Sequence, residues 1–450
     1  MDLEKALKTV GLFTEADKFE DVRKHVDPTW VATALEATGV ATVRKRRLPA
    51  EQVVWLVIGM AMFRKWPIHD LVGRLNLVLP SGPGGATVVP SSVAEARARL
   101  GAAPLESLFD MCGHKWGHES ARKHAWRELA LYGVDGSSLR IADFPETRSH
   151  YGGTSGARGE SGYPLVRIAG LMALRSHILA AAAVGPYSDS EIVLTALLWR
   201  EVPSNSLVLV DRGFLAAGIL VPLARDGQNR HWLTRAKSTT TWTVIKSLGK
   251  NEDLVELSIS SQARKYDPSL PKTYLARAIT YQRKGFRPQT LMTSMVDPKA
   301  HPADEVIALY HERWELELGY DEIKTEMLDR QETIRSRTVQ GIEQEVWGIL
   351  LAYNLVRLEM ARTAEDLGVE PTRISFVTSL RIICDTWAWC AIASPARCQR
   401  ASKPCANSSR GSSASPADIT PLSACREDQD EQLRQKAPGP CLGLTERHWC

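Results

Sequence analysis

The stretch NSLVLVDRGF, residues 205–214, indicates the class of fold that this sequence adopts. Its run of Leu and Val is typical of a strand that is buried on both faces, in a parallel sheet covered by helices. The sequence therefore predicts an α/β fold. The run ends at Asp211, and ligands bind at the carboxyl ends of strands in open α/β sheets. Asp211 is therefore the first candidate functional residue.

A second candidate, Asp135, lies in the segment LALYGVDGSSLRIAD, residues 129–143. The pattern predicts a strand, a turn at Asp135 and Gly136, and a second strand. Asp-Gly is a frequent hairpin turn, so a structural role and a functional role for Asp135 are both open. Residues 162–187 predict two further apolar strands, and Arg175 within them argues against a membrane helix.

The segment YHERWELELGYDEIK, residues 310–324, predicts a helix with a polar stripe at the border of the core. At roughly 100° per residue, four polar side chains fall within ~60° of one another. These four are Tyr310, Arg313, Glu317 and Lys324. The adjoining apolar stripe holds Leu309, Leu316, Tyr320, Ile323 and Met327. The opposite side is expected to be solvated and holds Glu312, Glu315, Glu322 and Glu326.

Asp135, Asp211 and Glu317 form a set of carboxylates that can converge beside the sheet. Three carboxylates at close range repel one another unless cations neutralise them. Mg²⁺ and Mn²⁺ prefer oxygen ligands, and two such ions support in-line phosphoryl transfer. The three residues therefore predict a metal site that acts on phosphodiesters.

The other polar residues of the stripe suit a nucleic-acid strand. Arg313 and Lys324 supply charge and hydrogen-bond donors for phosphates, and Tyr310 supplies a hydroxyl group or a stacking face. We therefore expect the stripe to face DNA.

The net charge of the 450-residue chain is only +4, but basic residues gather near its N-terminus. Residues 41–130 hold 13 Lys and Arg against 7 Asp and Glu, and include the run RKRR at 44–47. Short helices carrying Arg97 and Arg99 predict either a DNA-binding module or a plain helical bundle with solvated arginines.

Composition argues against several other classes of protein. Six of the eight cysteines fall within the last 61 residues, and none forms a C-x-x-C pair, so neither a zinc site nor a disulfide framework is expected. The N-terminus has no apolar signal segment, and the apolar runs are too short to span a bilayer. The sequence predicts a cytoplasmic protein that does not contact membranes.

The spacing Tyr-x2-Arg-x3-Glu-x6-Lys, met by the four residues of the stripe, resembles the signature of bacterial DDE transposases of the insertion sequence 4 family. DGSSLR, with Asp135, is similar to the strand that carries the family's first aspartate, and VDRGF, with Asp211, to the strand that carries its second. The resemblance covers residues 20–393. Residues 394–450 depart from the basic helical sequence of relatives.

The resemblance implies an RNase H-like core that carries Asp135, Asp211 and Glu317 as catalytic and metal-binding residues. It implies two Mg²⁺ ions, which Mn²⁺ can replace, and DNA contacts from Tyr310, Arg313 and Lys324. The expected partners are double-stranded DNA with terminal inverted repeats, target DNA and a second copy of the chain in a paired-end complex. The expected location is the bacterial nucleoid in the cytoplasm. Trp232 and Trp242 are candidates either for stacking on a flipped base or for plain packing.

The pattern and the resemblance together divide the chain into five parts. They are a helical N-terminal domain for DNA-end binding at 1–127, the first part of the core at 128–229, a β-rich insertion at 230–296, the second part of the core at 297–393, and a tail at 394–450. The tail lacks periodicity and is rich in Ser and Pro, which is typical of disorder or of a shift in reading frame near codon 393.

Three alternatives remain open at this point. The first is a metal-dependent nuclease on the same core, which would cleave phosphodiesters without joining ends. The second is an inactive or impaired copy that acts only as a DNA-binding protein. The third is a metal-free globular protein that carries the stripe by accident.

Overall fold

The computed structural model describes residues 25–41, 48–75, 77, 88–156, 159–330 and 333–392. The basic run at 44–47 and the tail at 394–450, for which the sequence predicted specific properties, lie outside the described residues. Within the described part, no helix combines the length and the hydrophobicity needed to cross a bilayer.

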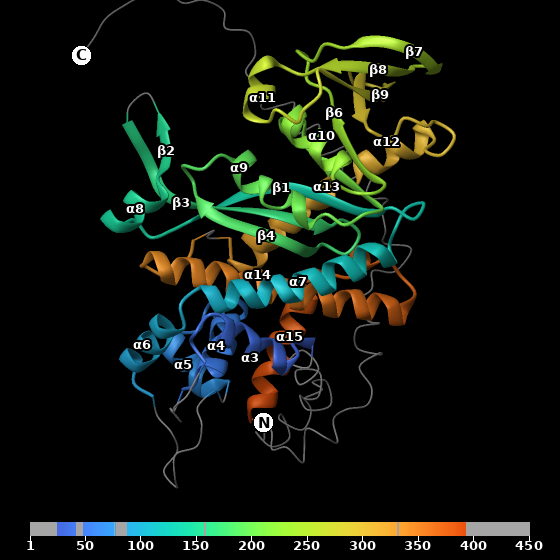
Figure 1. The fold of residues 1–450 in the computed structure, drawn as a ribbon. Coiled ribbons are helices and arrows are strands. Elements are labelled where there is room, and N and C mark those ends of the chain that lie inside the picture. The colour runs from blue at the N-terminus through green and yellow to red at the C-terminus, as the bar shows by residue number, and fades with distance from the viewer. Residues whose placement is uncertain are drawn as a thin grey trace, which may run out of the picture.

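A large mixed sheet forms the centre of the molecule (Figure 1). Among the described residues it has ten strands in the order β2-β3-β1-β5-β6-β10-β9-β8-β7, and β4 pairs with β3. The strands are β1 (Ala130–Arg140), β2 (Gly153–Gly156), β3 (Gly159–Ala173), β4 (Ile178–Pro186), β5 (Ser206–Val210), β6 (Arg230–Arg235), β7 (Thr243–Gly249), β8 (Glu252–Ser258), β9 (Thr273–Tyr281) and β10 (Gln289–Thr293).

The direction of the strands changes across the sheet. β1 runs parallel to β5, and β5 runs parallel to β6, whereas β3 and β4 are antiparallel to their neighbours. The strands of residues 243–293 extend the sheet beyond β6 through the antiparallel pair of β10 and β6. β5 is therefore a central strand that is buried along its whole length, and the predicted α/β class is confirmed.

Residues 130–140 form one continuous strand, so the prediction of a turn at Asp135 and Gly136 is wrong. The reason is the long partner strand β3, which pairs with β1 from Tyr132 to Arg140 and passes Asp135 without interruption. The parallel pairing with β5, in contrast, ends at Val134. Asp135 thus lies directly after the segment of β1 that pairs with β5, and β1 itself continues to Arg140.

Helices cover both faces of the sheet (Figure 1): α7 and α14 lie on one face, and α9 and α10 lie on the other, with α3 to α6 packed beyond α7 and α14. In chain order, the helices before residue 300 are α3 (Pro28–Ala37), α4 (Ala50–Met62), α5 (Ile68–Arg74), α6 (Pro90–Leu100), α7 (Ala103–Lys123), α8 (Pro145–Tyr151), α9 (Glu191–Ala196), α10 (Ala217–Arg225) and α11 (Ser261–Tyr266). Those that follow are α12 (Ala303–His311), α13 (Trp314–Asp321), a π-helical turn (Glu322–Met327), α14 (Val339–Leu367) and α15 (Phe376–Ile392).

Two glycines let α7 lie directly on the sheet. Gly113 and Gly117 are four residues apart and therefore share one side of the helix. A Cβ atom at Gly117 would lie 2.5 Å from the Cα of Ala180 in β4, and one at Gly113 would lie 2.9 Å from the Ala180 carbonyl oxygen. The backbone of α7 thus contacts the backbone of β4, which leaves no room for a larger residue at either position.

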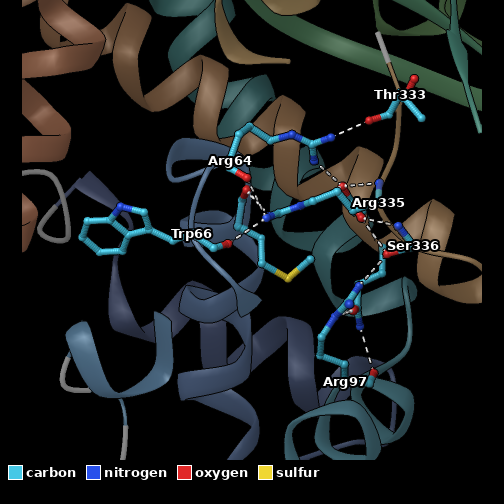
Figure 2. Close-up of polar contacts among 9 residues, drawn as sticks. Arg64, Trp66, Arg97, Thr333, Arg335 and Ser336 are labelled. Atoms are coloured by element: carbon cyan, nitrogen blue, oxygen red, sulfur yellow. Dashed lines mark hydrogen bonds and ion pairs between the residues drawn. The ribbon is translucent and has the colours of Figure 1, made fainter. Parts of the chain in front are cut away.

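Buried polar contacts join the N-terminal helices to α14, and Figure 2 shows those of Arg64, Arg335 and Ser336. Glu345 is fully buried and accepts hydrogen bonds from Arg64 Nη1 (2.5 Å), from the backbone N–H of Arg335 (3.0 Å), and from Ser336 through its N–H (2.9 Å) and its hydroxyl group (2.6 Å). Arg335 in turn donates to the carbonyl oxygen of Met60 (2.6 Å) at the end of α4. We call these contacts the Glu345 network.

Arg97 of α6 hydrogen-bonds to the same part of the chain and does not face solvent. Its Nε donates to Gln344 Oε1 (2.9 Å), and its Nη2 donates to the hydroxyl oxygen of Ser336 (3.0 Å). Burial is the main cause of the lowered pKa of Arg97, and Glu345 partly offsets it. The expectation of a solvated arginine is therefore wrong at this position.

Replacement of Glu345 by glutamine should destabilise the protein. The change leaves Arg64 without its anionic partner in a buried position, and losing one member of a buried ion pair costs about 3–5 kcal/mol. Urea unfolding followed by circular dichroism measures this change. Glu343→Gln, on the same helix and only partly buried, is the matched control and should shift stability by less than about 0.5 kcal/mol. Equal stability of the two variants would contradict the structural role of Glu345.

Candidate active site

Asp135 of β1 and Asp211, which directly follows β5, lie at the same end of two adjacent parallel strands. Val134 of β1 pairs with Val210, the last residue of β5, and each aspartate is the next residue along the chain. Neighbouring strands are about 4.8 Å apart, so the register alone brings the two carboxyl groups to the same end of the sheet.

The two aspartates also point to the same face of the sheet. Side chains alternate along a strand, so Asp135 shares its face with Leu131, and Asp211 shares its face with Leu207 and Leu209. These leucines belong to one core cluster, which also contains Leu316 of α13. The face that carries both aspartates is therefore the face on which α13 packs.

Two contacts fix α13 on this face. Leu316 packs against Gly133, where a Cβ atom would lie 2.6 Å from Leu316 Cδ1. The buried hydroxyl group of Tyr320 donates a hydrogen bond to the carbonyl oxygen of Asp135 (2.7 Å). Glu317 lies between Leu316 and Tyr320 in the sequence, so both contacts hold its helix next to Asp135.

The predicted single helix is divided into several parts. α12 ends at His311, α13 begins at Trp314, and a π-helical turn follows from Glu322 to Met327. The π-helical turn contains Lys324, so the 100° spacing used for the stripe does not hold there. Lys324 is half-buried and forms no hydrogen bond or ion pair with any other described residue.

Arg313 is the cation at the centre of the site. Its Nη2 donates to Glu317 Oε1 (2.9 Å), and the same side chain interacts electrostatically with Asp211, Tyr310 and Asp135. Tyr310 is only 8% exposed, and burial raises its pKa. Arg313 thus interacts with four of the other five predicted site residues, namely Asp135, Asp211, Tyr310 and Glu317.

Asp135 has an unusual electrostatic environment. Burial raises its pKa to about 7, and the carboxyl group of Glu191 adds to this rise, whereas the Gly136 N–H (2.9 Å) and Arg313 oppose it. Sequence analysis did not single out Glu191. The one feature of the sequence that relates to this contact is the glycine at position 136. A Cβ atom there would lie 2.6 Å from Glu191 Oε1, so a side chain would displace Glu191.

The prediction of a solvated side for the helix is wrong for three of its four glutamates. Glu312 forms a bidentate ion pair with Arg175 (2.8 and 2.9 Å), and Glu315 Oε2 contacts His177 Nε2 (2.8 Å). Glu322 accepts hydrogen bonds from Arg357 Nε (2.9 Å) and the Tyr353 hydroxyl (3.0 Å). These partners come from the turn between β3 and β4 and from α14, which the sequence pattern could not bring near the helix.

The two tryptophans singled out from the sequence differ in exposure. Trp232 of β6 is 1% exposed and packs in the second core cluster, with its ring 6.4 Å from that of Tyr274. Its ring therefore cannot stack on a base in this conformation. Trp242 is half-buried at the edge of the same cluster.

The donor chemistry of the site fits a hard divalent cation. All candidate ligands are carboxylates, which Mg²⁺ and Mn²⁺ prefer, and their mutual repulsion is the kind that a cation relieves. Within the described residues, however, no group of three or more His, Cys, Asp or Glu side chains is close enough to hold a metal ion in this conformation. The ion pair of Glu317 with Arg313 engages one of the three carboxylates.

The raised pKa of Asp135 predicts how stability depends on pH without metal. A carboxyl group whose folded pKa exceeds its unfolded value is destabilising above the unfolded pKa, so the penalty builds up between pH 3.8 and about 7. Asp135→Asn should therefore raise the melting temperature at pH 8 by at least about 2 °C and change it little at pH 4. Differential scanning fluorimetry in EDTA measures both values, and the same shift at both pH values would contradict the assignment.

Comparison with known proteins assigns the chain to a family. Residues 16–110 match the family described as insertion element 4 transposase N-terminal, and residues 126–355 match the family described as transposase DDE domain. The chain is 39% identical over 360 residues to the transposase InsG for insertion sequence element IS4 of Escherichia coli K12, covering 80% of each chain. It also has a TM-score of 0.40 and 11% identity to the piggyBac transposase in a synaptic complex with hairpin DNA, covering 94% of this chain and 84% of that one. The protein belongs to the insertion sequence 4 family of DDE transposases, which are metal-dependent enzymes that cleave DNA and transfer strands.

Proposed function

We propose that this transposase cuts DNA at the terminal inverted repeats of its own insertion sequence and joins the ends to target DNA. Asp135, Asp211 and Glu317 are the proposed catalytic residues and hold two Mg²⁺ ions, which Mn²⁺ can replace. The observation that carries the proposal is the parallel register of β1 and β5, which brings the two aspartates together under the helix of Glu317.

The topology supports an RNase H-like core for this chemistry. Its strands would be β4-β3-β1-β5-β6, with three antiparallel strands followed by two that run parallel to β1. We propose the same domains as the sequence predicted. The core consists of residues 128–229 and 297–393, the β-rich insertion spans 230–296, and the helical domain of residues 1–127 binds the DNA ends.

The reaction consists of two in-line displacements at phosphorus. In the first, a water oxygen attacks the phosphodiester, the P–O3′ bond breaks, and the element's end is left with a 3′-hydroxyl group. In the second, this 3′-oxygen attacks a target phosphodiester and displaces its 3′-oxygen. Bound Mg²⁺ would activate the attacking oxygen and stabilise the leaving oxygen.

The proposed DNA contacts follow from the positions of three residues. Arg313 can form paired hydrogen bonds with phosphate oxygens once Glu317 is released to bind metal. Lys324, which has no partner among the described residues, is available for a neighbouring phosphate. Tyr310 is buried beside Asp211, so its hydroxyl group and not its ring face is the proposed contact.

The proposed assembly is a homodimer that holds two element ends in a paired-end complex with target DNA. Two ends must be joined to one target, so two active sites have to act at a fixed distance from each other. Strand-transfer products distinguish this function from that of a nuclease with the same active site.

Asp211→Asn should abolish cleavage while DNA-end binding persists. The change keeps the shape of the side chain but removes a charged metal ligand, so cleavage of an end-containing oligonucleotide should fall by at least about 10³-fold. Asp226→Asn, at the exposed end of α10, is the matched control and should cleave normally. Binding without cleavage by the unmodified chain would instead identify it as a DNA-binding protein only.

Arg313→Ala should separate metal binding from catalysis. Removing the arginine frees Glu317, so Mn²⁺ affinity should be unchanged or higher, whereas cleavage should fall about 10²-fold because a phosphate contact is lost. Calorimetric Mn²⁺ titration and an oligonucleotide cleavage assay measure the two effects. A parallel loss of both properties would show that Arg313 supports the site and does not contact DNA.

A further inference from the structure

We infer that Glu191 is a fourth carboxylate of the active site and binds one of the metal ions together with Asp135. This inference rests on the proposed function, since it concerns the ions held by Asp135, Asp211 and Glu317. It adds a ligand from α9, the helix that follows β4 on the opposite face of the sheet from α14 (Figure 1).

Glycines at two positions of the sheet bring α9 close enough for this role. Gly185 of β4 receives Leu194, whose Cδ2 would lie 2.8 Å from a Cβ atom there. Gly136 of β1 receives Glu191, whose Oε1 would lie 2.6 Å from a Cβ atom. Any larger residue at Gly136 would push the Glu191 carboxyl group away from the strand that carries Asp135.

The carboxyl groups of Glu191 and Asp135 interact electrostatically. Glu191 Oε1 lies against Gly136, the residue after Asp135, and the Gly136 N–H donates a hydrogen bond to Asp135 Oδ1 (2.9 Å). Both residues are half-buried, so water screens their repulsion less than it would on an open surface. A divalent cation bound by both groups converts this repulsion into attraction, and such a pair is a common way to hold Mg²⁺.

The N-terminal cap of α9 does not depend on Glu191. The N-terminus of α9 is capped by Ser190, whose side chain accepts a hydrogen bond from the Val193 N–H (3.3 Å). A glutamate that completes a capping box occupies the third helical position, which here is Val193, whereas Glu191 occupies the first. A role in local structure therefore does not explain why this side chain points to Asp135.

Mn²⁺ titration of the full-length protein without DNA tests the inference. Glu191→Gln should weaken Mn²⁺ binding by about 10–100-fold, as loss of a group that supports a metal site typically does. Glu191→Asp, which keeps the charge but is one methylene shorter, should also bind more weakly. Electron spin echo measurements should count one more water molecule on Mn²⁺ in Glu191→Gln. Glu146→Gln, an exposed glutamate in the first turn of α8, is the matched control and should bind as the unmodified protein does.

Three results would overturn the inference. Unchanged Mn²⁺ affinity in Glu191→Gln would show that Glu191 is no ligand. Weak binding in Glu191→Gln with normal binding in Glu191→Asp, and no additional water, would reduce its role to a long-range effect of charge. If Asp135→Asn and Asp211→Asn also bind Mn²⁺ normally, the proposed metal site itself fails, whereas loss of binding in those two variants alone would reject only the role of Glu191.

Discussion

The parallel pairing of β1 with β5 is the constraint on which the rest of the structure depends. It places Asp135 next to Asp211 because Val134 and Val210 are partners in the register. A parallel pair needs a crossover, and here the chain between the two strands includes α8, β2, β3, β4 and α9. The crossover that the pairing requires thus also carries Glu191, whose carboxyl group interacts with Asp135. The parallel pairing therefore helps to position three carboxylates, those of Asp135, Asp211 and Glu191.

The remaining carboxylate, Glu317, is positioned by ion pairs and by apolar packing. Glu312, Glu315 and Glu322 connect its helix to the β3–β4 turn and to α14, and α14 is connected to the N-terminal helices by the Glu345 network (Figure 2). The pairs of Glu315 with His177 and of Glu322 with Arg357 are largely buried. Such pairs contribute little net stability but are costly to break, so they favour one arrangement over its alternatives. α14 thus links the helix of Glu317 to the N-terminal helices.

The sequence could indicate those candidate site residues that depend on local pattern. Asp211 was predicted because a buried strand precedes it, and Arg313 and Glu317 because their spacing of four residues puts them on one side of a helix. Pattern could not show that a long partner strand carries β1 past Asp135. It could not find the partners of Arg97 either, since Gln344 and Ser336 lie more than 200 residues away along the chain. Ion pairs between distant segments leave no periodic signal.

The charge balance of the site explains why it needs cations. Asp135, Asp211, Glu317 and Glu191 all carry carboxyl groups, and Arg313 interacts electrostatically with the first three. A single guanidinium group cannot neutralise four carboxylates, and the raised pKa of Asp135 is one consequence. Two divalent ions carry four positive charges and would balance the four carboxylates without Arg313. The arginine would then be free to leave Glu317 for a phosphate, so loading of metal and binding of the DNA backbone would be coupled through this one side chain.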